Sequence, residues 1–429
     1  MKTFLQPLQN LAEMEEIQKQ TKKNCGILEI SGCMESQKAH LMYGLSGLFP
    51  CHLVIAADEK SAKELYEDYR FYDKRVYYYP AKDLLFFQAD IHGNLLIRQR
   101  MQVIRALLER EDEITVVTSI DGCMDYLAPL EKIEKQLIYF RNDSTLDMDK
   151  LTAALVHMGY ERVGQVEMPG QFSIRGGIID IYSLTEENPW RIELWGDEID
   201  SIRSFDAQSQ RSLENLDDVT IYPAAEQPME KNGVSFLDYF KETETLFFLD
   251  ELNHLEENAK AVQEEFQQSC ENRKEKGEIS LSGDWMCTWE ELCHKINDRN
   301  CVAMSLLDPK KSNWKISGQF NITVKSMSSY QSSFELLVKD LKQYKKEGYQ
   351  IVLLSGSRTR AERLAKDLQE EGLNAFYGQD SDRILQPGEI MVAYGHARRG
   401  FEYPLVKFAV ITETDIFGKE QKKRKKKKK

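Results

Sequence analysis

The chain has 429 residues, 41% hydrophobic and 10% aromatic, which is enough for several packed domains and excludes global disorder. No apolar run approaches the ~18 residues that cross a bilayer, and the first residues, MKTFLQPLQNLAEMEE, lack the apolar core of a signal peptide. We therefore expect a cytoplasmic protein with no membrane partner, although its net charge of −13 is unevenly distributed.

Residues 1–135 alternate between expected strands and helices, and this alternation indicates a parallel sheet with helices on both faces. The expected strands are Ile27–Ser31, His52–Ala56, Val76–Tyr79 and Ile114–Ser119, and the expected helices are Gln37–Leu48, Lys60–Tyr69 and Asn94–Glu109.

The first strand-to-helix junction is where such a fold binds a nucleotide. A phosphate-binding loop has the pattern GxxxxGK[ST], in which the glycines admit the phosphates, the lysine neutralises them and the hydroxyl holds magnesium. The aligned residues run from Gly32 to Ala39. Lys38 is present, but Gln37 replaces the second glycine and Ala39 replaces the hydroxyl. We expect a degenerate loop in a RecA-like domain, without productive ATP binding.

Residues 136–218 are expected to form an inserted β-rich domain with one helix, Met148–His157. The two-residue period that places side chains on one face of a strand includes Phe172, Ile174, Ile179, Ile181, Ile192 and Leu194. Gly176 and Gly177 allow a bulge or a tight bend.

The opposite face of this sheet carries Arg175, Arg191 and Trp195. One interpretation is a solvated face in which Arg191 pairs with a carboxylate, that of Glu193 or Asp180. The other is a docking surface, because arginine and tryptophan are enriched at interface hot spots. Composition alone leaves both interpretations open.

Residues 219–325 are expected to return to the first sheet, with helices near His254–Lys274 and Trp289–Ile296. The segment Thr245–Glu251, TLFFLDE, has the form of a buried strand that ends in two carboxylates, as in a Walker B motif. Without a working phosphate loop, we interpret Asp250 and Glu251 as solvated carboxylates at a strand end.

Residues 332–416 are expected to form a separate small α/β domain. Its expected elements are the helices Ser333–Tyr344 and Thr359–Gly372 and the strands Ile351–Ser355, Ile390–Ala393 and Phe408–Thr412. SGSRTRAE has the form of a phosphate-binding turn, but it lacks GK[ST], which favours a plain turn of the fold over a nucleotide site. His396, Arg398 and Arg399 form a basic cluster of unassigned use.

Residues 417–429 form a basic linker or tail. The last eleven residues carry nine basic groups and one acidic group, whereas residues 1–418 carry a net charge of −21. An acidic body is a poor general binder of DNA, because nonspecific affinity comes mostly from neutralising phosphates. The tail could contact nucleic acid, but a lysine run is more typical of a disordered linker.

The sequence shows no catalytic or metal constellation. The eight cysteines form no CxxC pair, and the seven histidines have no HExxH spacing. No GxSxG elbow is present. We therefore expect no metal, no catalytic activity and reduced thiols.

Several segments resemble a known family. QFSIRGGIIDIY, PWRIELWGDEIDSIRSFD and SQR resemble the region shared by the excinuclease subunit UvrB and the bacterial transcription-repair coupling factor (Mfd) family. VTSIDGCMDYLAP, SGSRTRAERLAKDL, GHARRGFEYP and FAVITETDIFG look like coupling factor rather than UvrB. The resemblance covers residues 1–418 and corresponds to the N-terminal third of a coupling factor.

This resemblance implies a domain plan. It comprises a degenerate RecA-like domain in residues 1–135 that residues 219–325 complete, an inserted UvrB domain 2-like unit in residues 136–218, and the small domain in residues 332–416. The aromatic hairpin of UvrB falls on a shortened segment here, so we expect it to be missing. We therefore interpret the aromatic residues of this segment as core side chains rather than as side chains that stack on bases. These are Tyr77, Tyr78, Tyr79, Phe86 and Phe87.

The resemblance also implies a function. UvrA-contacting positions of the family fall on Arg175, Arg191 and Trp195, where Trp195 replaces an expected phenylalanine. The chain would recruit UvrA to stalled RNA polymerase in transcription-coupled nucleotide excision repair, without ATPase activity of its own. The family's ATP, magnesium, RNA polymerase and double-stranded DNA sites would lie in downstream domains, and the chain looks cut at a basic linker.

The alternative is a part of an ATP-dependent DNA translocase that contributes to DNA binding. On the first interpretation, Arg191→Ala should weaken UvrA binding and leave the melting temperature nearly unchanged.

Overall fold

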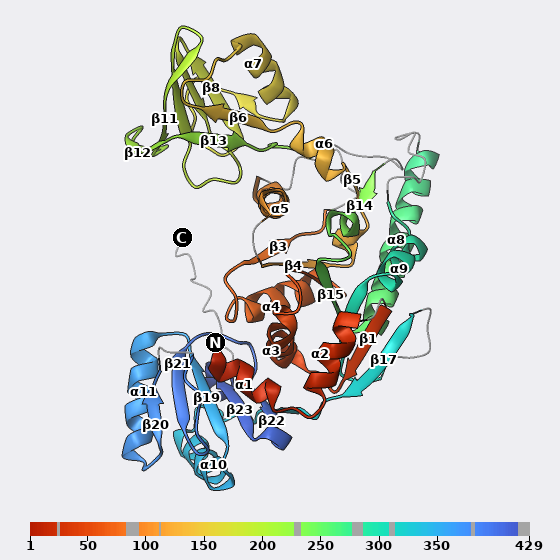
Figure 1. Cartoon of the computed structure of the whole chain (residues 1–429), viewed down its shortest axis with the longest axis vertical. Coiled ribbons are helices and arrows are strands. Elements are labelled where there is room, and N and C mark those ends of the chain that lie inside the picture. Colours follow the sequence, from red (N-terminus) through yellow and green to blue (C-terminus); the bar gives the residue numbers. More distant parts are fainter. Residues whose placement is uncertain are drawn as a thin grey trace. The chain divides into compact units, whose positions relative to one another are not determined.

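The computed structural model describes residues 1–23, 26–82, 94–110, 113–226, 233–276, 286–308, 314–378 and 382–418. The chain forms two compact units. Figure 1 labels their helices and strands. The first comprises residues 1–76, 242–257 and 293–429, and the second comprises residues 77–241 and 258–292. Phe86, Phe87 and the basic residues 419–429 of the sequence analysis lie outside the described residues.

The largest sheet has seven strands in the order β17-β1-β16-β15-β2-β4-β3, and the first five belong to the first unit. Neighbours among these five strands pair in parallel. The strands are β1 (Gly26–Ser31), β2 (Cys51–Ala56), β3 (Val76–Tyr79), β4 (Ile114–Ser119), β15 (Thr245–Asp250), β16 (Asn300–Ser305) and β17 (Ile316–Asn321). Every residue of β1, β4 and β15 is buried, as expected for strands inside a parallel sheet. The predicted α/β class is confirmed.

Four helices of the first unit precede or connect these strands: α1 (Lys2–Gln9), α2 (Met14–Lys23), α3 (Glu35–Ser46) and α4 (Glu59–Tyr69). The sequence analysis predicted no element before Ile27 and therefore missed α1 and α2. Helix α2 is largely polar and buries only Met14, Ile17 and Thr21, which is too sparse a pattern to predict a helix from periodicity.

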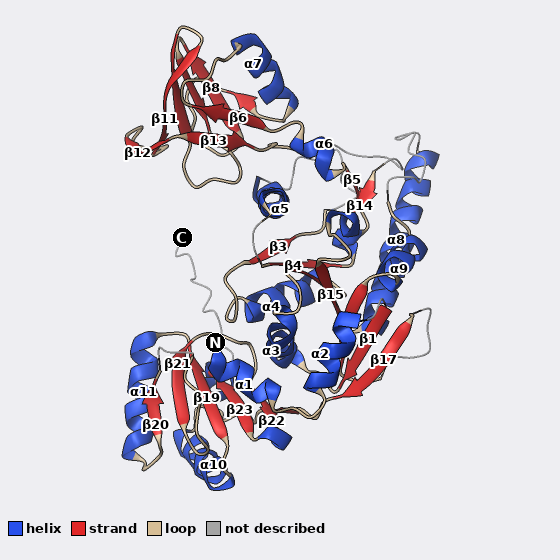
Figure 2. Cartoon of the chain, viewed as in Figure 1, coloured by secondary structure: helices blue, strands red, loops and turns tan. Residues whose placement is uncertain are grey.

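The small C-terminal domain of the first unit has a mixed sheet in the order β18-β22-β23-β19-β21-β20. Its elements are β18 (Lys325–Ser326), α10 (Phe334–Glu347), β19 (Gln350–Ser355), α11 (Arg358–Glu370), β20 (Ala375–Tyr377), β21 (Ile390–Tyr394), β22 (Phe401–Tyr403), β23 (Phe408–Thr412) and α12 (Glu413–Phe417). Apolar side chains of α10 and α11 pack with those of β19 and β21 in one core. Figure 2 shows these helices and strands in the small domain. The unpredicted strands β18, β20 and β22 have only two or three residues each.

The second unit contains the inserted domain, whose mixed sheet has the order β12-β11-β10-β9-β8-β7. Its strands are β7 (Glu161–Arg162), β8 (Gln171–Arg175), β9 (Ile178–Ile181), β10 (Trp190–Trp195), β11 (Glu198–Phe205) and β12 (Ser212–Leu216). A two-stranded sheet pairs β6 (Ile138–Arg141) with β13 (Asp218–Ile221). Helix α7 (Met148–His157) contributes Leu151 and Leu155 to the domain core.

The inserted sheet has the apolar face that the sequence predicted. Phe172, Ile179, Ile181 and Ile192 are fully buried in its core, and Ile174 and Leu194 pack against it. The two glycines after Arg175 form the hairpin turn between β8 and β9 rather than a bulge, and the bulge lies between Glu193 and Leu194.

The remaining described strands and α-helices are α5 (Asn94–Glu109), β5 (Tyr126–Leu127), α6 (Leu130–Glu134), β14 (Val234–Ser235), α8 (Leu252–Glu275) and α9 (Trp289–Asn297), and three short 3₁₀ helices are also present. In the second unit the ring of Tyr79 is fully buried and stacks on Phe236, with a centroid distance of 3.8 Å. Tyr78 is also buried. The interpretation as core residues is confirmed for Tyr78 and Tyr79, whereas Tyr77 is only partly buried.

Candidate functional site

A single buried carboxylate organises the polar face of the inserted sheet. Asp180 on β9 lies opposite Ser173 on β8 and Arg191 on β10 in the strand register, and its side chain is only 1% exposed. Arg191 donates from Nε at 2.7 Å and from Nη2 at 2.9 Å to its two oxygens. Arg175 donates from Nη2 at 2.6 Å. Two guanidinium groups therefore share one carboxylate, and this cluster has a net charge of +1.

Arg191 is held from several sides. Its Nη2 also donates to Gln210 at 3.0 Å, and its guanidinium carbon lies 4.4 Å from the ring centroid of the buried Phe205. The hydrogen bonds to Asp180 raise the pKa of Arg191 above its usual range. Only 14% of its side chain is exposed. Most of the Arg191 side chain is therefore committed to contacts within the domain, and little of it is accessible to a partner.

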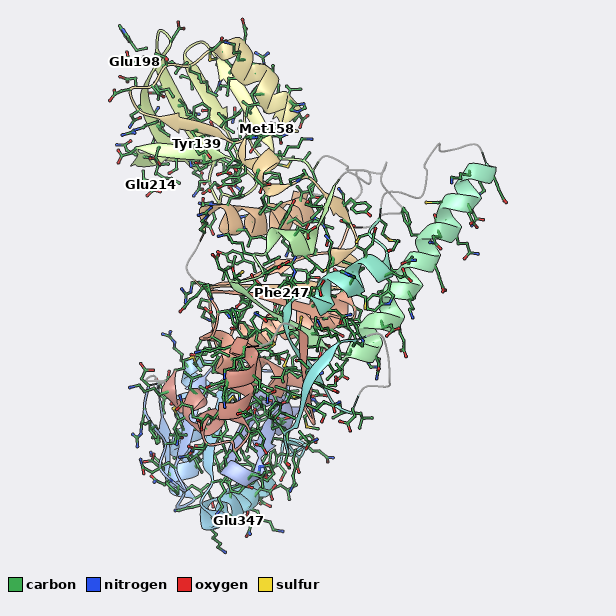
Figure 3. All side chains as sticks on the ribbon, turned by 45° about the vertical axis from the view of Figure 1, so that its right-hand side comes forward. Tyr139, Met158, Glu198, Glu214, Phe247 and Glu347 are labelled. Carbon is green, nitrogen blue, oxygen red and sulfur yellow. The ribbon has the colours of Figure 1, made fainter. Side chains whose placement is uncertain are left out.

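Arg175 and Trp195 are the accessible members of this face. The side chain of Arg175 is 47% exposed, and Trp195 is 83% exposed at the last position of β10. Trp195 pairs in register with Glu198 across a hairpin whose Gly196 has a φ of +65°, a conformation that favours glycine. Figure 3 marks Glu198 on this domain. The hairpin turn thus places the indole in solvent beside acidic residues.

The structure changes the stability expected of Arg191→Ala. The assignment of Arg175, Arg191 and Trp195 to UvrA binding stays a prediction. Arg191 pairs with Asp180, one of the two carboxylates named as alternatives, while Glu193 binds Arg203 instead. Because Arg191 neutralises a buried charge, its replacement by alanine is no longer expected to leave the melting temperature unchanged. The sequence analysis did not foresee the contributions of Phe205 and Gln210, because they come from strand-end and loop positions that no local pattern connects to Arg191.

Gln37 and Lys38, in the segment that the sequence analysis interprets as a degenerate phosphate loop, pair with other side chains of the first unit. Lys38 Nζ lies 2.6 Å from Asp250 Oδ1 and 2.6 Å from Glu251 Oε1, and its side chain is 8% exposed. Burial lowers the pKa of Lys38, but the two carboxylates more than offset this, so the net shift is upward. The interpretation of these carboxylates as solvated is wrong for Asp250, which is buried. The lysine that would neutralise a phosphate is already neutralised.

The neighbouring loop positions reinforce this arrangement. Gln37 is fully buried, accepts a hydrogen bond from the Met34 amide and donates to Tyr403 Oη at 2.9 Å. Ala39 is also fully buried and supplies no hydroxyl. The cavity that remains beside Lys38 and Asp250 has a volume of about 270 Å³, below the ~300–1,000 Å³ of typical ligand pockets.

His396, Arg398 and Arg399, the basic cluster of the small domain, do not share one site. Arg398 donates to buried Asp68 from its backbone amide at 2.9 Å and from Nε at 3.0 Å. Ser36 at the start of α3 donates to the same carboxylate at 2.8 Å. Arg399 Nε lies 3.8 Å from Glu35. These arginines therefore join the small domain to the degenerate loop, and His396 lines a different cavity.

Residues 138–226 match the family described as the UvrB interaction domain. The fold and this match define a multidomain α/β chain that carries a UvrB interaction domain. The transcription-repair-coupling factor of Bacillus subtilis (strain 168) is 30% identical over 475 aligned positions, which cover 93% of this chain and 40% of the relative. Those of Staphylococcus haemolyticus and Staphylococcus epidermidis are 26% and 25% identical over 82% of the chain.

The chain is homologous to the N-terminal region of transcription-repair-coupling factors, as its sequence resemblance predicted. It spans about two fifths or less of the length of these relatives. In the described part of the chain, no helix is both long and apolar enough to cross a membrane.

Proposed function

We propose that this chain recruits UvrA through the Arg–Trp face, which comprises Arg175, Arg191 and Trp195. The observation that carries the proposal is the 83% exposure of Trp195 on the same strand as Arg191, which with Arg175 is anchored on one buried carboxylate, all within the matched UvrB interaction domain. An indole that is 83% exposed buries little apolar area in the domain itself, and tryptophan and arginine are enriched at interface hot spots.

The geometry favours a partner surface with a carboxylate and an apolar recess. Arg175 commits its Nη2 to Asp180, and the rest of its guanidinium group can form a bidentate pair with a carboxylate. Trp195 supplies apolar area with a polar N–H edge. Because the hydrogen bond to Asp180 already restricts Arg175, less side-chain freedom is lost on binding.

The chain would act in transcription-coupled nucleotide excision repair without hydrolysing ATP. This part of the proposal is supported by the ion pairs of Lys38 with Asp250 and Glu251 and by Gln37 and Ala39 in the loop. Contacts to RNA polymerase and double-stranded DNA, and the ATP and magnesium of a motor, would belong to regions of a coupling factor outside this chain. A calorimetric titration with Mg-ATP tests this part, and binding that is lost in Lys38→Ala would contradict it.

The test of UvrA recruitment is a calorimetric titration of the full chain with purified UvrA. Trp195→Ala should weaken binding by about tenfold or more, as expected for a hot-spot residue. Tyr139→Ala is the matched control, because Tyr139 is 64% exposed in the same domain, on β6 (Figure 3). Equal losses for the two variants, or none for either, would refute the assignment of this face.

A further inference from the structure

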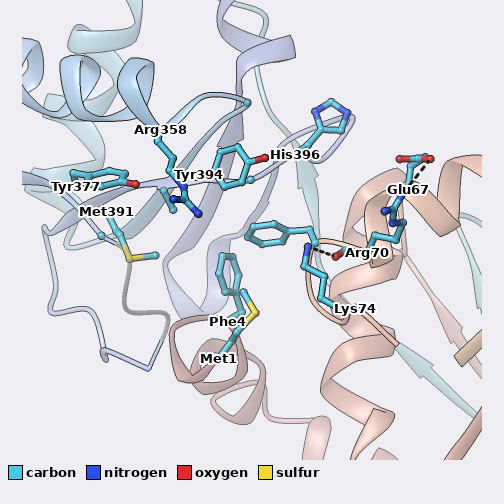
Figure 4. Close-up of a pocket in the computed structure, with 15 residues that line it drawn as sticks. Met1, Phe4, Glu67, Arg70, Lys74, Arg358, Tyr377, Met391, Tyr394 and His396 are labelled. Atoms are coloured by element: carbon cyan, nitrogen blue, oxygen red, sulfur yellow. Dashed lines mark hydrogen bonds and ion pairs between the residues drawn. The ribbon is translucent and has the colours of Figure 1, made fainter. Parts of the chain in front are cut away.

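A second cavity of the first unit is lined by basic and aromatic residues, unlike the cavity beside Lys38. Its volume is about 750 Å³, within the range typical of ligand pockets. It lies beyond the carboxyl ends of β20 and β21 and at the start of α11, which follows β19. Ligands of open α/β sheets bind in crevices outside the carboxyl ends of the strands. Figure 4 shows the cavity with its lining residues.

The charged groups of this cavity are mostly basic. Arg70, Lys74 and Arg358 line it, and Glu67 is its one lining carboxylate, with Glu67 Oε1 4.0 Å from Arg70 Nη1. Within the described ranges, Lys74 and Arg358 have no carboxylate within ion-pair distance. Residues 1–418 have a net charge of −21, whereas the charged residues that line this cavity are mostly basic. It is suited to an anion.

The position of Arg358 strengthens this preference. Arg358 is the first residue of the 13-residue helix α11, and the side chain of its N-cap residue, Ser357, does not cap the helix. The positive end of the helix dipole therefore adds to the charge of the guanidinium group. A phosphate at this end of the cavity would meet both.

Aromatic rings form the other part of the lining. Tyr377 and Tyr394 come from the sheet, and Phe4 and Phe71 form an edge-to-face pair with a centroid distance of 5.2 Å. Tyr394 is 55% exposed, and the guanidinium carbon of Arg358 lies 5.6 Å from its ring centroid. A site for phosphate alone needs no such rings. Aromatic faces beside arginines are typical of sites that stack nucleobases.

We infer that this cavity binds a nucleoside phosphate, either free or as one unit of a single-stranded nucleic acid. Arg70, Lys74 and Arg358 hold the phosphate, and Tyr394 stacks on the base. The turn SGSRTRAE, which has no GK[ST] ending, thereby gains a ligand-binding role through the cavity that it borders. The site is separate from the degenerate loop, whose cavity is lined by Lys38, Asp250 and Glu251.

The experiment uses the full chain and two probes at physiological ionic strength. ADP is titrated by calorimetry, and a fluorescein-labelled oligothymidine is titrated by fluorescence anisotropy. Arg358→Glu should weaken binding of at least one probe by about tenfold or more, because it reverses a phosphate-contacting charge. Tyr394→Ala should weaken the same probe by roughly fivefold through lost stacking.

Arg363→Glu is the matched control, because Arg363 is exposed on the same helix and does not line the cavity. The basic tail is identical in all variants, so its contribution to oligothymidine binding cancels. A loss confined to ADP identifies a free nucleotide, and a loss confined to oligothymidine identifies a nucleic acid strand. The inference is overturned if neither probe distinguishes Arg358→Glu from Arg363→Glu, which includes the case in which neither probe binds.

Discussion

Replacing Arg191 with alanine should destabilise the inserted domain. Asp180 is 1% exposed and accepts three hydrogen bonds from guanidinium groups, two of them from Arg191. Removing one partner of a buried ion pair costs about 3–5 kcal/mol, because it leaves an uncompensated charge. Since Arg175 retains its hydrogen bond, we expect the low end of this range, about 3 kcal/mol.

Hydrogen exchange measured by mass spectrometry is the appropriate assay, because a chain of two units does not unfold in one transition. An energy of about 3 kcal/mol corresponds to an increase on the order of 100-fold in local opening, since each 1.4 kcal/mol is about tenfold. The increase should appear in amides of β9 and β10. Arg162→Ala, at an exposed position on β7, is the control and should leave exchange unchanged.

A double variant separates charge from packing. Asp180→Leu combined with Arg191→Met removes both charges, and buried ion pairs replaced by apolar residues are often neutral or stabilising. We expect slower exchange in the double variant than in Arg191→Ala alone. Unchanged exchange in Arg191→Ala would refute the view that Asp180 depends on Arg191 for its burial.

Two further predictions concern the first unit. Burial lowers the pKa of His40 to about 4, against about 6.5 in an unfolded chain. As the pH falls from about 6.5 to about 4, the unfolded chain therefore binds a proton that the folded chain does not. The free energy of unfolding should fall by up to roughly 3 kcal/mol over this pH range. Urea denaturation at stepped pH, followed through the hydrogen exchange of first-unit amides, should show this loss in the wild-type chain and a flatter profile in His40→Gln, and parallel profiles would contradict it. Gly32→Ala should cost about 2 kcal/mol or more, because its φ is +81° and an added Cβ would lie 2.2 Å from the Ile322 carbonyl oxygen. Hydrogen exchange of first-unit amides should be faster in Gly32→Ala but not in Gly47→Ala, where an added Cβ meets open space, and equal exchange in the two variants would refute the argument.

The bounds of several strands and helices were predicted correctly from patterns of apolar residues within each element. Strands β3, β4 and β23 and helices α5 and α7 have the predicted bounds, because buried parallel strands appear as apolar runs and amphipathic helices have a 3.6-residue period. The short strands β18, β20 and β22 were missed, since two or three residues carry no period. Helix α2 was missed because its few buried positions do not form a continuous apolar stripe.

The candidate residues themselves were identified from the sequence, through the resemblance of their surrounding segments to a known family. Their different exposures could not be predicted in this way. Arg191 and Trp195 have the same parity on one strand, yet one is 14% and the other 83% exposed. The difference arises from Phe205 and Gln210, which pack on Arg191 from distant positions in the chain.

The sequence by itself determined the α/β class, the presence of Gln37 and Ala39 where a GxxxxGK[ST] pattern has a glycine and a hydroxyl residue, and the apolar and polar faces of the inserted sheet. These features depend on residue identity and short-range spacing. Only the tertiary structure decided that Lys38 is paired with Asp250 and Glu251, and that Arg70, Lys74 and Arg358 line one cavity with Tyr394. Ion pairs and cavities form between side chains far apart in the sequence, and chain folding alone sets their distances.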